Sequence, residues 1–245
     1  MQPTTALLGV IPARLASTRL PRKALAEIAG VPMIERVYRG ARESRALAEI
    51  IVATDADEIL DFCRRRSIPA RMTATTHLSG TDRVWEVAMT EGAEAVVNIQ
   101  GDEPMVRGAM LDTLVAALFA RAECEIATLA TPIYGQEAQE PSAVKVVCDA
   151  RGLARYFSRA PIPFPRDGAP GAYLKHLGYY AYSRGALDQF HALPVSRLEA
   201  IEKLEQLRFL ENGWEITVAE TPHDSIGVDT AEDLARVDAV LRARR

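Results

Sequence analysis

A cationic loop near the N-terminus is the first stretch of this 245-residue chain whose side chains suit chemistry on a phosphorylated substrate. Between Arg14 and Lys23, four cations, two hydroxyl groups and a proline follow a short apolar run. Backbone N–H groups and cations of such a loop can hold an anion, and a triphosphate is the anion that needs so many donors. A solvated basic loop is the alternative, because the glycine patterns of the P-loop and of dinucleotide-binding folds are absent from the sequence.

Two carboxylates follow other apolar stretches of the chain. Asp102 comes after the run 96–99 and Gln100, and Asp229 follows Gly227-Val228. Magnesium is usually bound by one or two carboxylates together with substrate phosphates. Read alone, Asp102 also suits a solvated turn and Asp229 a helix N-cap. As a pair they could share one metal ion, so the sequence predicts Mg²⁺ as the cofactor of a nucleotide site.

Two further groups are weaker candidates. Ser79 offers a hydroxyl group at the start of an expected helix, where it could contact a nucleotide or simply cap the helix. His176 lies on an expected strand with Tyr180. A core histidine is the alternative there, and no serine or cysteine nucleophile is arranged around it, so hydrolytic catalysis has little support.

The elements that must position these residues alternate along the first half of the chain. Continuous apolar runs predict strands at 7–11, 50–53, 95–99 and 126–133. Helical patterns lie between or after them at 33–43, 58–66, 82–91 and 110–121. Continuous apolar strands separated by amphipathic helices predict an α/β fold with a mostly parallel sheet. Ligands of such sheets bind beyond the carboxyl ends of the strands, where the cationic loop and Asp102 fall.

The second half has a different pattern. Strands are expected at 144–148 and 176–182, around a proline-rich loop at 160–171. We therefore expect one domain, 1–245, with an inserted β-rich segment at about 140–185. A helix is expected next, with an apolar stripe and an i,i+4 pair between Glu199 and Lys203. The stripe consists of Leu198, Ile201, Leu204 and Leu207.

Composition excludes several classes of protein. The net charge of −4 leaves no basic footprint, so nucleic acid is not an expected partner. No apolar run approaches the roughly 20 residues that span a bilayer, and no secretory signal pattern is present, so we expect a cytoplasmic protein without membrane contact. The three cysteines form no C-x-x-C pair, which argues against a zinc site or a disulfide framework.

Taken in order, the motifs resemble one family over nearly the whole chain. The loop 11–23 with its continuation 30–34 is similar to the signature of the CMP-sugar synthetases. Further matching segments lie at 53–55, 77–83, 97–104, 143–147, 156–163, 176–178, 204–208 and 227–230. Each motif alone is unspecific, but their order and spacing identify the chain as a member of this family.

The resemblance implies a fold and a reaction. The fold would be a Rossmann-like nucleotidyltransferase (GT-A-like) fold with a mostly parallel central sheet and an inserted β-rich dimerisation segment. The reaction would be CTP plus 3-deoxy-manno-octulosonate (Kdo) giving CMP-Kdo and diphosphate, which activates the sugar for lipopolysaccharide biosynthesis. The family is typically homodimeric.

Roles for single residues also follow from the resemblance. Triphosphate-holding positions match Arg14, Ser17 and Lys23, and magnesium-ligand positions match Asp102 and Asp229. Gln100 matches a position between nucleotide and sugar. The Kdo-pocket positions match Arg159, His176, Tyr180, Glu205 and Gln206. Arg14, Lys23, Asp102 and Asp229 would be the catalytic set, and Ser79 is added to the nucleotide-binding set.

Two departures from the family pattern keep other readings open. Arg22 stands where the family usually has glycine, and Leu78 stands where it usually has glutamine. A basic residue at the first position is similar to the CMP-sialate synthetases, so sialate is an alternative acceptor, as is an 8-amino analogue of Kdo. The motifs at 156–163 and 176–178 favour Kdo. A nucleotide-binding regulator without turnover is the alternative from another class.

Overall fold

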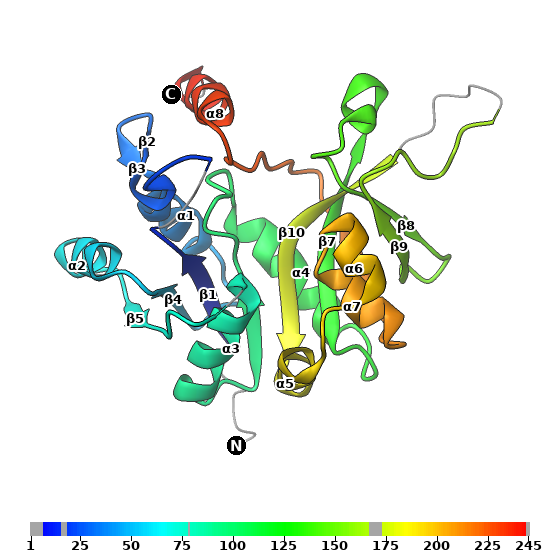
Figure 1. Ribbon diagram of the computed structural model, residues 1–245, viewed down its shortest axis with the longest axis horizontal. Helices are drawn as coiled ribbons and strands as arrows, with labels where there is room; N and C mark the ends of the chain where they lie inside the picture. The colour runs from blue at the N-terminus through cyan, green and yellow to red at the C-terminus, as the bar shows by residue number, and fades with distance from the viewer. Residues whose placement is uncertain (1–6, 16–18, 78, 167–172, 244–245) are drawn as a thin grey trace. The chain divides into compact units, whose positions relative to one another are not determined.

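The computed structural model describes residues 7–15, 19–77, 79–166 and 173–243, so Ser17 and Leu78 lie outside the described residues. The chain forms two compact units (Figure 1). Unit 1 contains residues 1–112 and 225–245, and unit 2 contains residues 113–224. The organisation as one domain with an inserted segment at about 140–185 stays a prediction. In the described part of the chain, no helix is long and apolar enough to cross a membrane.

Unit 1 is built on parallel strands in the order β6-β1-β4-β5. Its strands are β1 (Leu7–Ala13), β2 (Glu27–Ile28), β3 (Val31–Pro32), β4 (Glu49–Thr54), β5 (Ala70–Met72) and β6 (Ala95–Asn98). Its helical segments are η1 (Lys23–Leu25), α1 (Met33–Ala41), α2 (Asp57–Arg65), α3 (Gly80–Glu91) and α8 (Ala231–Ala243), and α4 (Gly108–Phe119) starts in this unit. β2 and β3 pair separately as a two-stranded antiparallel ribbon.

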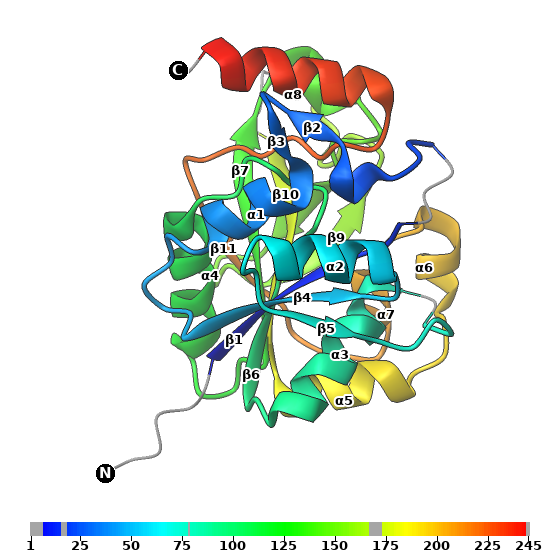
Figure 2. The same cartoon turned by 90° about the vertical axis from the view of Figure 1, so that its left-hand side faces the viewer.

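The parallel strands of unit 1 coincide with the apolar runs of the sequence because both of their faces are covered by helices. Figure 2 shows α1 and α2 on one side of β1, β4 and β5, with α3 on the other. This is the arrangement that right-handed crossovers require, since the chain moves outward to β5 through α1 and α2 and returns to β6 through α3. The expected α/β fold with a mostly parallel sheet is confirmed.

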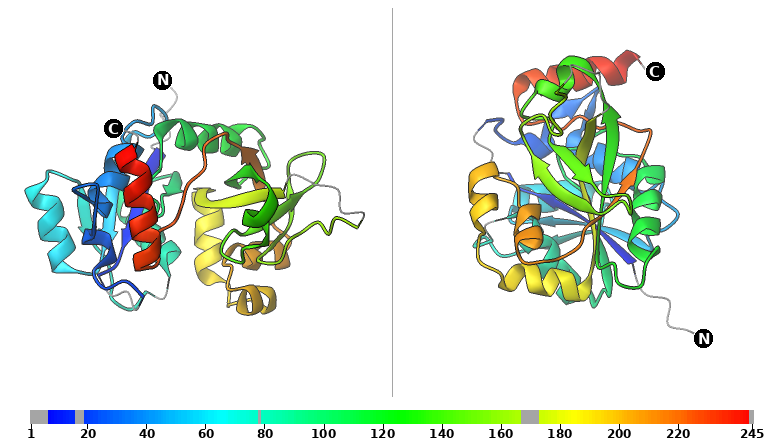
Figure 3. Two further views of the ribbon diagram at one scale, coloured as in Figure 1. Left: turned by 90° about the horizontal axis from the view of Figure 1, so that it is seen from above. Right: turned by 90° about the vertical axis from the view of Figure 1, so that its right-hand side faces the viewer.

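Unit 2 is mixed, with β10 antiparallel to both β7 and β8 and β11 parallel to β7. Its strands are β7 (Ile126–Ile133), β8 (Lys145–Cys148), β9 (Ala154–Ser158), β10 (Tyr173–Ser183) and β11 (Thr217–Glu220). Its helical segments are η2 (Gly135–Gln139), α5 (Arg184–Ala192), α6 (Arg197–Glu202) and α7 (Gln206–Glu211). Figure 3 shows α5, α6 and α7, coloured yellow to orange, gathered at one side of these strands.

The prediction of one continuous helix along the apolar stripe from Leu198 to Leu207 is wrong. The chain breaks into α6 and α7 at Lys203, whose backbone is left-handed with φ 55°. Ile201, expected in the core, is exposed. Glu199 does not pair with Lys203; it binds the buried Arg208 through both carboxylate oxygens, at 2.6 and 2.7 Å. The chain therefore forms two short helices, α6 and α7, joined at Lys203 and linked by the buried Glu199–Arg208 ion pair, in place of one helix with a continuous apolar stripe.

Candidate active site

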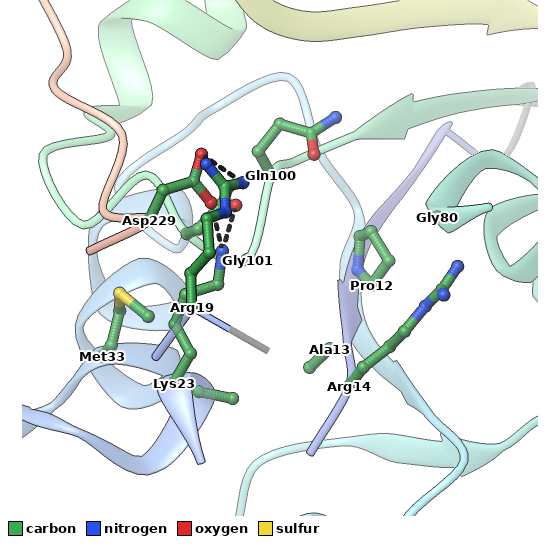
Figure 4. Close-up of a pocket in the computed structure, with 12 residues that line it drawn as sticks. Pro12, Ala13, Arg14, Arg19, Lys23, Met33, Gly80, Gln100, Gly101 and Asp229 are labelled. Atoms are coloured by element: carbon green, nitrogen blue, oxygen red, sulfur yellow. Dashed lines mark hydrogen bonds and ion pairs between the residues drawn. The ribbon is translucent and has the colours of Figure 1, made fainter. Parts of the chain in front are cut away.

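A cavity of about 330 Å³ opens in unit 1 at the carboxyl ends of β1 and β6 (Figure 4). Its volume falls in the range of small-molecule sites. The cavity is lined by Pro12, Ala13, Arg14, Arg19, Lys23, Ala24, Met33, Gly80, Gln100, Gly101, Asp102 and Asp229. The structure therefore brings five residues of the predicted site into one pocket: Arg14, Lys23, Gln100, Asp102 and Asp229.

A close backbone approach fixes the loop that carries Asp102. β1 and β6 run parallel with Val10 opposite Asn98, so the chain leaves both strands at the same edge of the sheet. A Cβ atom on Gly101 would lie 2.4 Å from the carbonyl oxygen of Pro12. Only glycine leaves room for this approach, which explains its place directly before Asp102.

Asp102 and Asp229, although 127 positions apart, meet at the amine of Lys23. The Lys23 Nζ atom lies 2.7 Å from Asp102 Oδ2 and 3.0 Å from Asp229 Oδ1. An Arg19 guanidinium nitrogen lies 3.0 Å from the other oxygen of Asp229, Oδ2. Figure 4 shows Arg19 and Lys23 extending side by side toward Asp229. Two carboxylates thus converge on one point that already accommodates positive charge.

The ion pairs shift the acidity of the groups involved. Burial of Lys23 opposes its charge, but Asp102 and Asp229 outweigh burial and raise the pKa of the amine above its usual value. Burial likewise opposes the charge of Asp229, yet Lys23 and Arg19 lower its pKa below the usual value. Both groups are therefore charged at neutral pH.

The carboxylate groups of Asp102 and Asp229 are oxygen donors of the kind that a magnesium ion binds. Among the described residues, no three His, Cys, Asp or Glu side chains gather as a complete metal site. Two carboxylates are nevertheless what Mg²⁺ takes from proteins when phosphates and water complete its shell. Asp102 and Asp229 are thus the residues that could hold the ion beside a nucleotide.

The segment 225–229 is tied down so that Asp229 faces Asp102. The Val228 N–H donates to the Asp102 carbonyl at 2.9 Å, and the Ser225 hydroxyl donates to Glu103. The sequence left open whether Asp229 caps the last helix. Thr230 performs that task, since its hydroxyl oxygen accepts from the Asp233 N–H at 3.2 Å. The Asp229 carboxylate is directed instead to the two cations.

The remaining predicted nucleotide contacts lie at different places. The Arg14 side chain extends away from Asp229 in Figure 4, across the pocket, so it would meet a different part of an anion. Ser79 is the N-cap of α3, accepting from the Asp82 N–H at 3.1 Å. Its hydroxyl is thus engaged in a capping box, while its neighbour Gly80 lines the pocket. The role of Ser79 in nucleotide binding stays a prediction.

Arg22 has a structural explanation in its backbone. Its φ of 58° is left-handed, the conformation that glycine adopts most easily. Its guanidinium group turns outward to Glu58 on α2 and does not line the pocket. The charge that stands in place of the family's glycine is therefore directed away from the site.

In unit 2, His176 and Tyr180 belong to a ring cluster on β10. The His176 ring lies 5.0 Å from that of Phe157 and 5.4 Å from that of Tyr180. Burial lowers the pKa of His176 to about 3, so the ring is neutral at physiological pH. The His176 Nε2 atom lies 3.1 Å from the Thr128 hydroxyl oxygen. Burial, together with the nearby Tyr182 and Glu205, raises the pKa of Tyr180.

Arg159, the residue expected to hold the sugar carboxylate, is committed to backbone carbonyls. It donates to the carbonyl oxygens of Glu202 at 2.8 Å, Pro141 at 3.1 Å and Lys203 at 3.4 Å. It thereby satisfies the C-terminal end of α6. A carboxylate contact would have to replace some of these bonds, and the role of Arg159 in sugar binding stays a prediction.

Glu205 and Gln206 start α7 in the same unit. Gln206 is buried, and its Nε2 atom meets no hydrogen-bond partner among the described residues. A buried amide normally has a partner, so this donor suits an oxygen-rich ligand or a bound water. The Tyr180 hydroxyl group, also buried, meets no hydrogen-bond partner among the described residues either, so two of the predicted sugar-pocket residues have polar atoms that need a partner.

Sequence reasoning missed Arg19 as an individual site residue. The loop contains four cations of similar chemistry: Arg14, Arg19, Arg22 and Lys23. Which of them faces the carboxylates depends on turns such as the left-handed one at Arg22. The signal available beforehand was only the density of charge in the loop.

A family model described as cytidylyltransferase matches residues 8–217. The chain belongs to the cytidylyltransferase family. The name of that family describes transfer of a cytidylyl group, and this chain places Arg14, Arg19 and Lys23 of its cationic loop in one pocket of unit 1 with both carboxylates. This match and the relatives described next together confirm the resemblance to CMP-sugar synthetases.

Individual relatives cover nearly the whole length of this cytidylyltransferase. A 3-deoxy-manno-octulosonate cytidylyltransferase of Koribacter versatilis is 53% identical over 242 residues, 98% of this chain and 92% of that protein. One of Acidobacterium capsulatum is 53% identical over 240 residues, 98% of each chain. A solved CMP:2-keto-3-deoxy-manno-octonic acid synthetase complexed with CTP is similar with a TM-score of 0.93 and 42% identity, covering 98% and 99% of the two chains.

Proposed function

We propose that this cytidylyltransferase converts CTP and Kdo to CMP-Kdo and diphosphate, activating the sugar for lipopolysaccharide biosynthesis. The observation that carries the proposal is the convergence of Asp102 and Asp229 on Lys23 in a pocket at the strand ends. Relatives 53% identical over 98% of the chain bear the name of this activity, and a similar solved structure holds CTP. We expect a cytoplasmic homodimer that contacts neither membrane nor nucleic acid.

The chemistry needs positioning and neutralisation of charge more than a covalent intermediate. The anomeric hydroxyl of the sugar would attack the α-phosphorus in line, with diphosphate leaving. Lys23 and Arg14 line the pocket and would neutralise phosphate oxygens. Ser17, which lies outside the described residues, is a further predicted donor. Gln100, which follows β6 and lines the pocket, would position the nucleotide relative to the sugar.

Magnesium bound at Asp102 and Asp229 would polarise the α-phosphate and lower the pKa of the attacking hydroxyl group. Unit 2 offers hydrogen-bonding groups that suit a polyhydroxylated sugar. They belong to Tyr180, Glu205, Gln206 and His176, and the His176 ring is neutral. Arg159 would bind the carboxylate of the sugar if that group replaced some of the backbone carbonyl oxygens to which Arg159 now donates. These assignments supply what a cytidylyl transfer to an acidic sugar requires.

A diphosphate-release assay tests the function. We expect release that requires CTP, Kdo and Mg²⁺ together, and no release with ATP, GTP or UTP in place of CTP. Absence of release from folded protein in the complete mixture would refute the activity. Comparison of kcat/KM for Kdo, its 8-amino analogue and sialate decides the acceptor, because equal or better use of another acid rejects Kdo.

A nucleotide-binding regulator is the competing function from another class. It predicts CTP binding without product. Measurable turnover removes it, so the same assay separates the two hypotheses.

A further inference from the structure

Three carboxylate oxygens of the pocket are held by the chain's own cations. Lys23 binds Asp102 Oδ2 and Asp229 Oδ1, and Arg19 binds Asp229 Oδ2. We call Arg19 and Lys23 the counterion pair. The Lys23 side chain is only 18% exposed, whereas that of Arg19 is 65% exposed, so the lysine contacts are the stronger ones.

The same oxygens are the ones that a divalent cation would coordinate. Mg²⁺ requires oxygen ligands at about 2.0–2.1 Å in near-ideal geometry. An ammonium group within 3.0 Å of both carboxylates stands where the ion must be, and like charges repel strongly at that separation. The metal and the Lys23 contact therefore exclude each other.

If Lys23 leaves the carboxylates, its charge needs another anion nearby. The triphosphate of a bound nucleotide would supply that anion in the same pocket. Lys23 and Arg19 lie on long, flexible side chains in the loop predicted to bind the triphosphate. Phosphate oxygens beside the carboxylates would accept both cations once the metal replaces them. Without such an anion, a metal ion must compete with the counterion pair unaided.

We propose that Arg19 and Lys23 act as a built-in counterion lock on Asp102 and Asp229, which a divalent cation opens readily only together with a nucleoside triphosphate. The proposal rests on the metal assignment of the proposed function. It gives Arg19 a positioning role and gives Lys23 a second role besides phosphate binding. The consequence is that metal and nucleotide enter the site as a coupled pair.

Mn²⁺ binding to the full chain without nucleotide tests the lock, with free Mn²⁺ measured by electron paramagnetic resonance. We expect Lys23→Met to bind Mn²⁺ about 10- to 100-fold more tightly than the wild type, the range of typical coupling between sites. Arg19→Gln should tighten binding by only about two- to fivefold, since exposed ion pairs are weak. The matched control is Arg22→Gln, which removes a cation of the same loop whose partner is Glu58; it should leave Mn²⁺ binding unchanged.

A second variant ties the gain to the carboxylates. Adding Asp102→Asn to Lys23→Met should abolish the tighter binding. The proposal is overturned if Lys23→Met binds Mn²⁺ no more tightly than the wild type, if Arg22→Gln gains as much, or if the gain survives Asp102→Asn.

Failure of the lock and failure of the proposed function give different results. The Mn²⁺ titration needs neither CTP nor Kdo, whereas the diphosphate-release assay needs both. Wild-type turnover with equal Mn²⁺ affinities in wild type and Lys23→Met rejects the lock alone. If the wild type shows no turnover but Lys23→Met binds Mn²⁺ more tightly than the wild type, the lock is supported and the activity is rejected.

Discussion

Charged residues in the two units are used in opposite ways. In unit 1, Lys23 meets Asp102 and Asp229 side chain to side chain in an open pocket. In unit 2, Arg208 and Glu199 are buried against each other, with Arg208 also donating to the Leu193 carbonyl at 3.2 Å. The first arrangement can exchange partners when a ligand arrives, while the second is closed and holds α6 and α7 together.

The difference separates chemistry from architecture among residues of the same type. A buried pair loses much if one partner is removed, because the other charge stays desolvated. A half-exposed cluster tolerates removal structurally but loses its ability to organise a ligand. Substitutions in each unit should therefore affect different measurements.

The largest expected effect is on turnover in unit 1. Asp102→Asn removes a proposed metal ligand, so kcat/KM should fall by about 10³-fold or more, as for loss of a key charge-stabilising group. Circular dichroism and the unfolding temperature should change little. Asp61→Asn, at an exposed pair with Arg64, is the matched control and should keep full activity. Activity within a few-fold of wild type in Asp102→Asn would contradict the metal assignment.

The next effect is on stability in unit 2. Glu199→Ala leaves Arg208 buried without its carboxylate partner, which should cost about 3–5 kcal/mol in the free energy of unfolding. Denaturant titration measures this value. Asp188→Ala, in the exposed pair with Arg184, should cost less than about 1 kcal/mol. Equal losses in the two variants would show that burial of the Glu199–Arg208 pair does not matter.

Local sequence patterns predicted the elements whose burial is uniform. β1, β4, β6 and β7 were found because strands covered on both faces are continuous apolar runs. The break at Lys203 was not predicted, because no residue type typical of a left-handed backbone, such as glycine, stands at that position. The partner of Glu199 was also missed, since an i,i+4 rule sees only the same helix.

The candidate site shows the same limit. The type and position of Asp102 and Asp229 were enough to predict that the two carboxylates lie together, whereas the metal ion that they were expected to share stays a prediction. The contribution of Arg19, and the choice of Thr230 over Asp229 as the cap of the last helix, depend on side-chain direction, which one sequence does not encode visibly. Arg159 shows the converse, since a suitable residue type can be consumed by backbone carbonyls.

A smaller effect concerns pH and His176 in unit 2. The folded pKa of about 3 lies below the roughly 6.5 of an unfolded histidine, so between these values the unfolded chain binds a proton that the native chain does not. Stability from this group is complete above pH 6.5 and falls as the pH decreases, by about 2 kcal/mol at pH 5. In His176→Gln, the stability difference between pH 7.5 and pH 5 should be smaller by that amount. An unchanged difference would show that His176 is not held neutral.

The smallest effect is expected at Arg22, which tests the boundary of the unit 1 site. Arg22→Gly removes the cost of a left-handed arginine, about 1 kcal/mol, and loses an exposed pair with Glu58 worth at most about that much. Stability should change by less than about 1 kcal/mol, and the KM for CTP by less than about twofold, because the guanidinium group faces α2. Glu58→Gln breaks the same pair without altering the backbone, so it separates the two contributions. A several-fold rise in the KM for CTP in Arg22→Gly, but not in Glu58→Gln, would place Arg22 at the phosphates and extend the exchangeable charge cluster to all four cations of the loop.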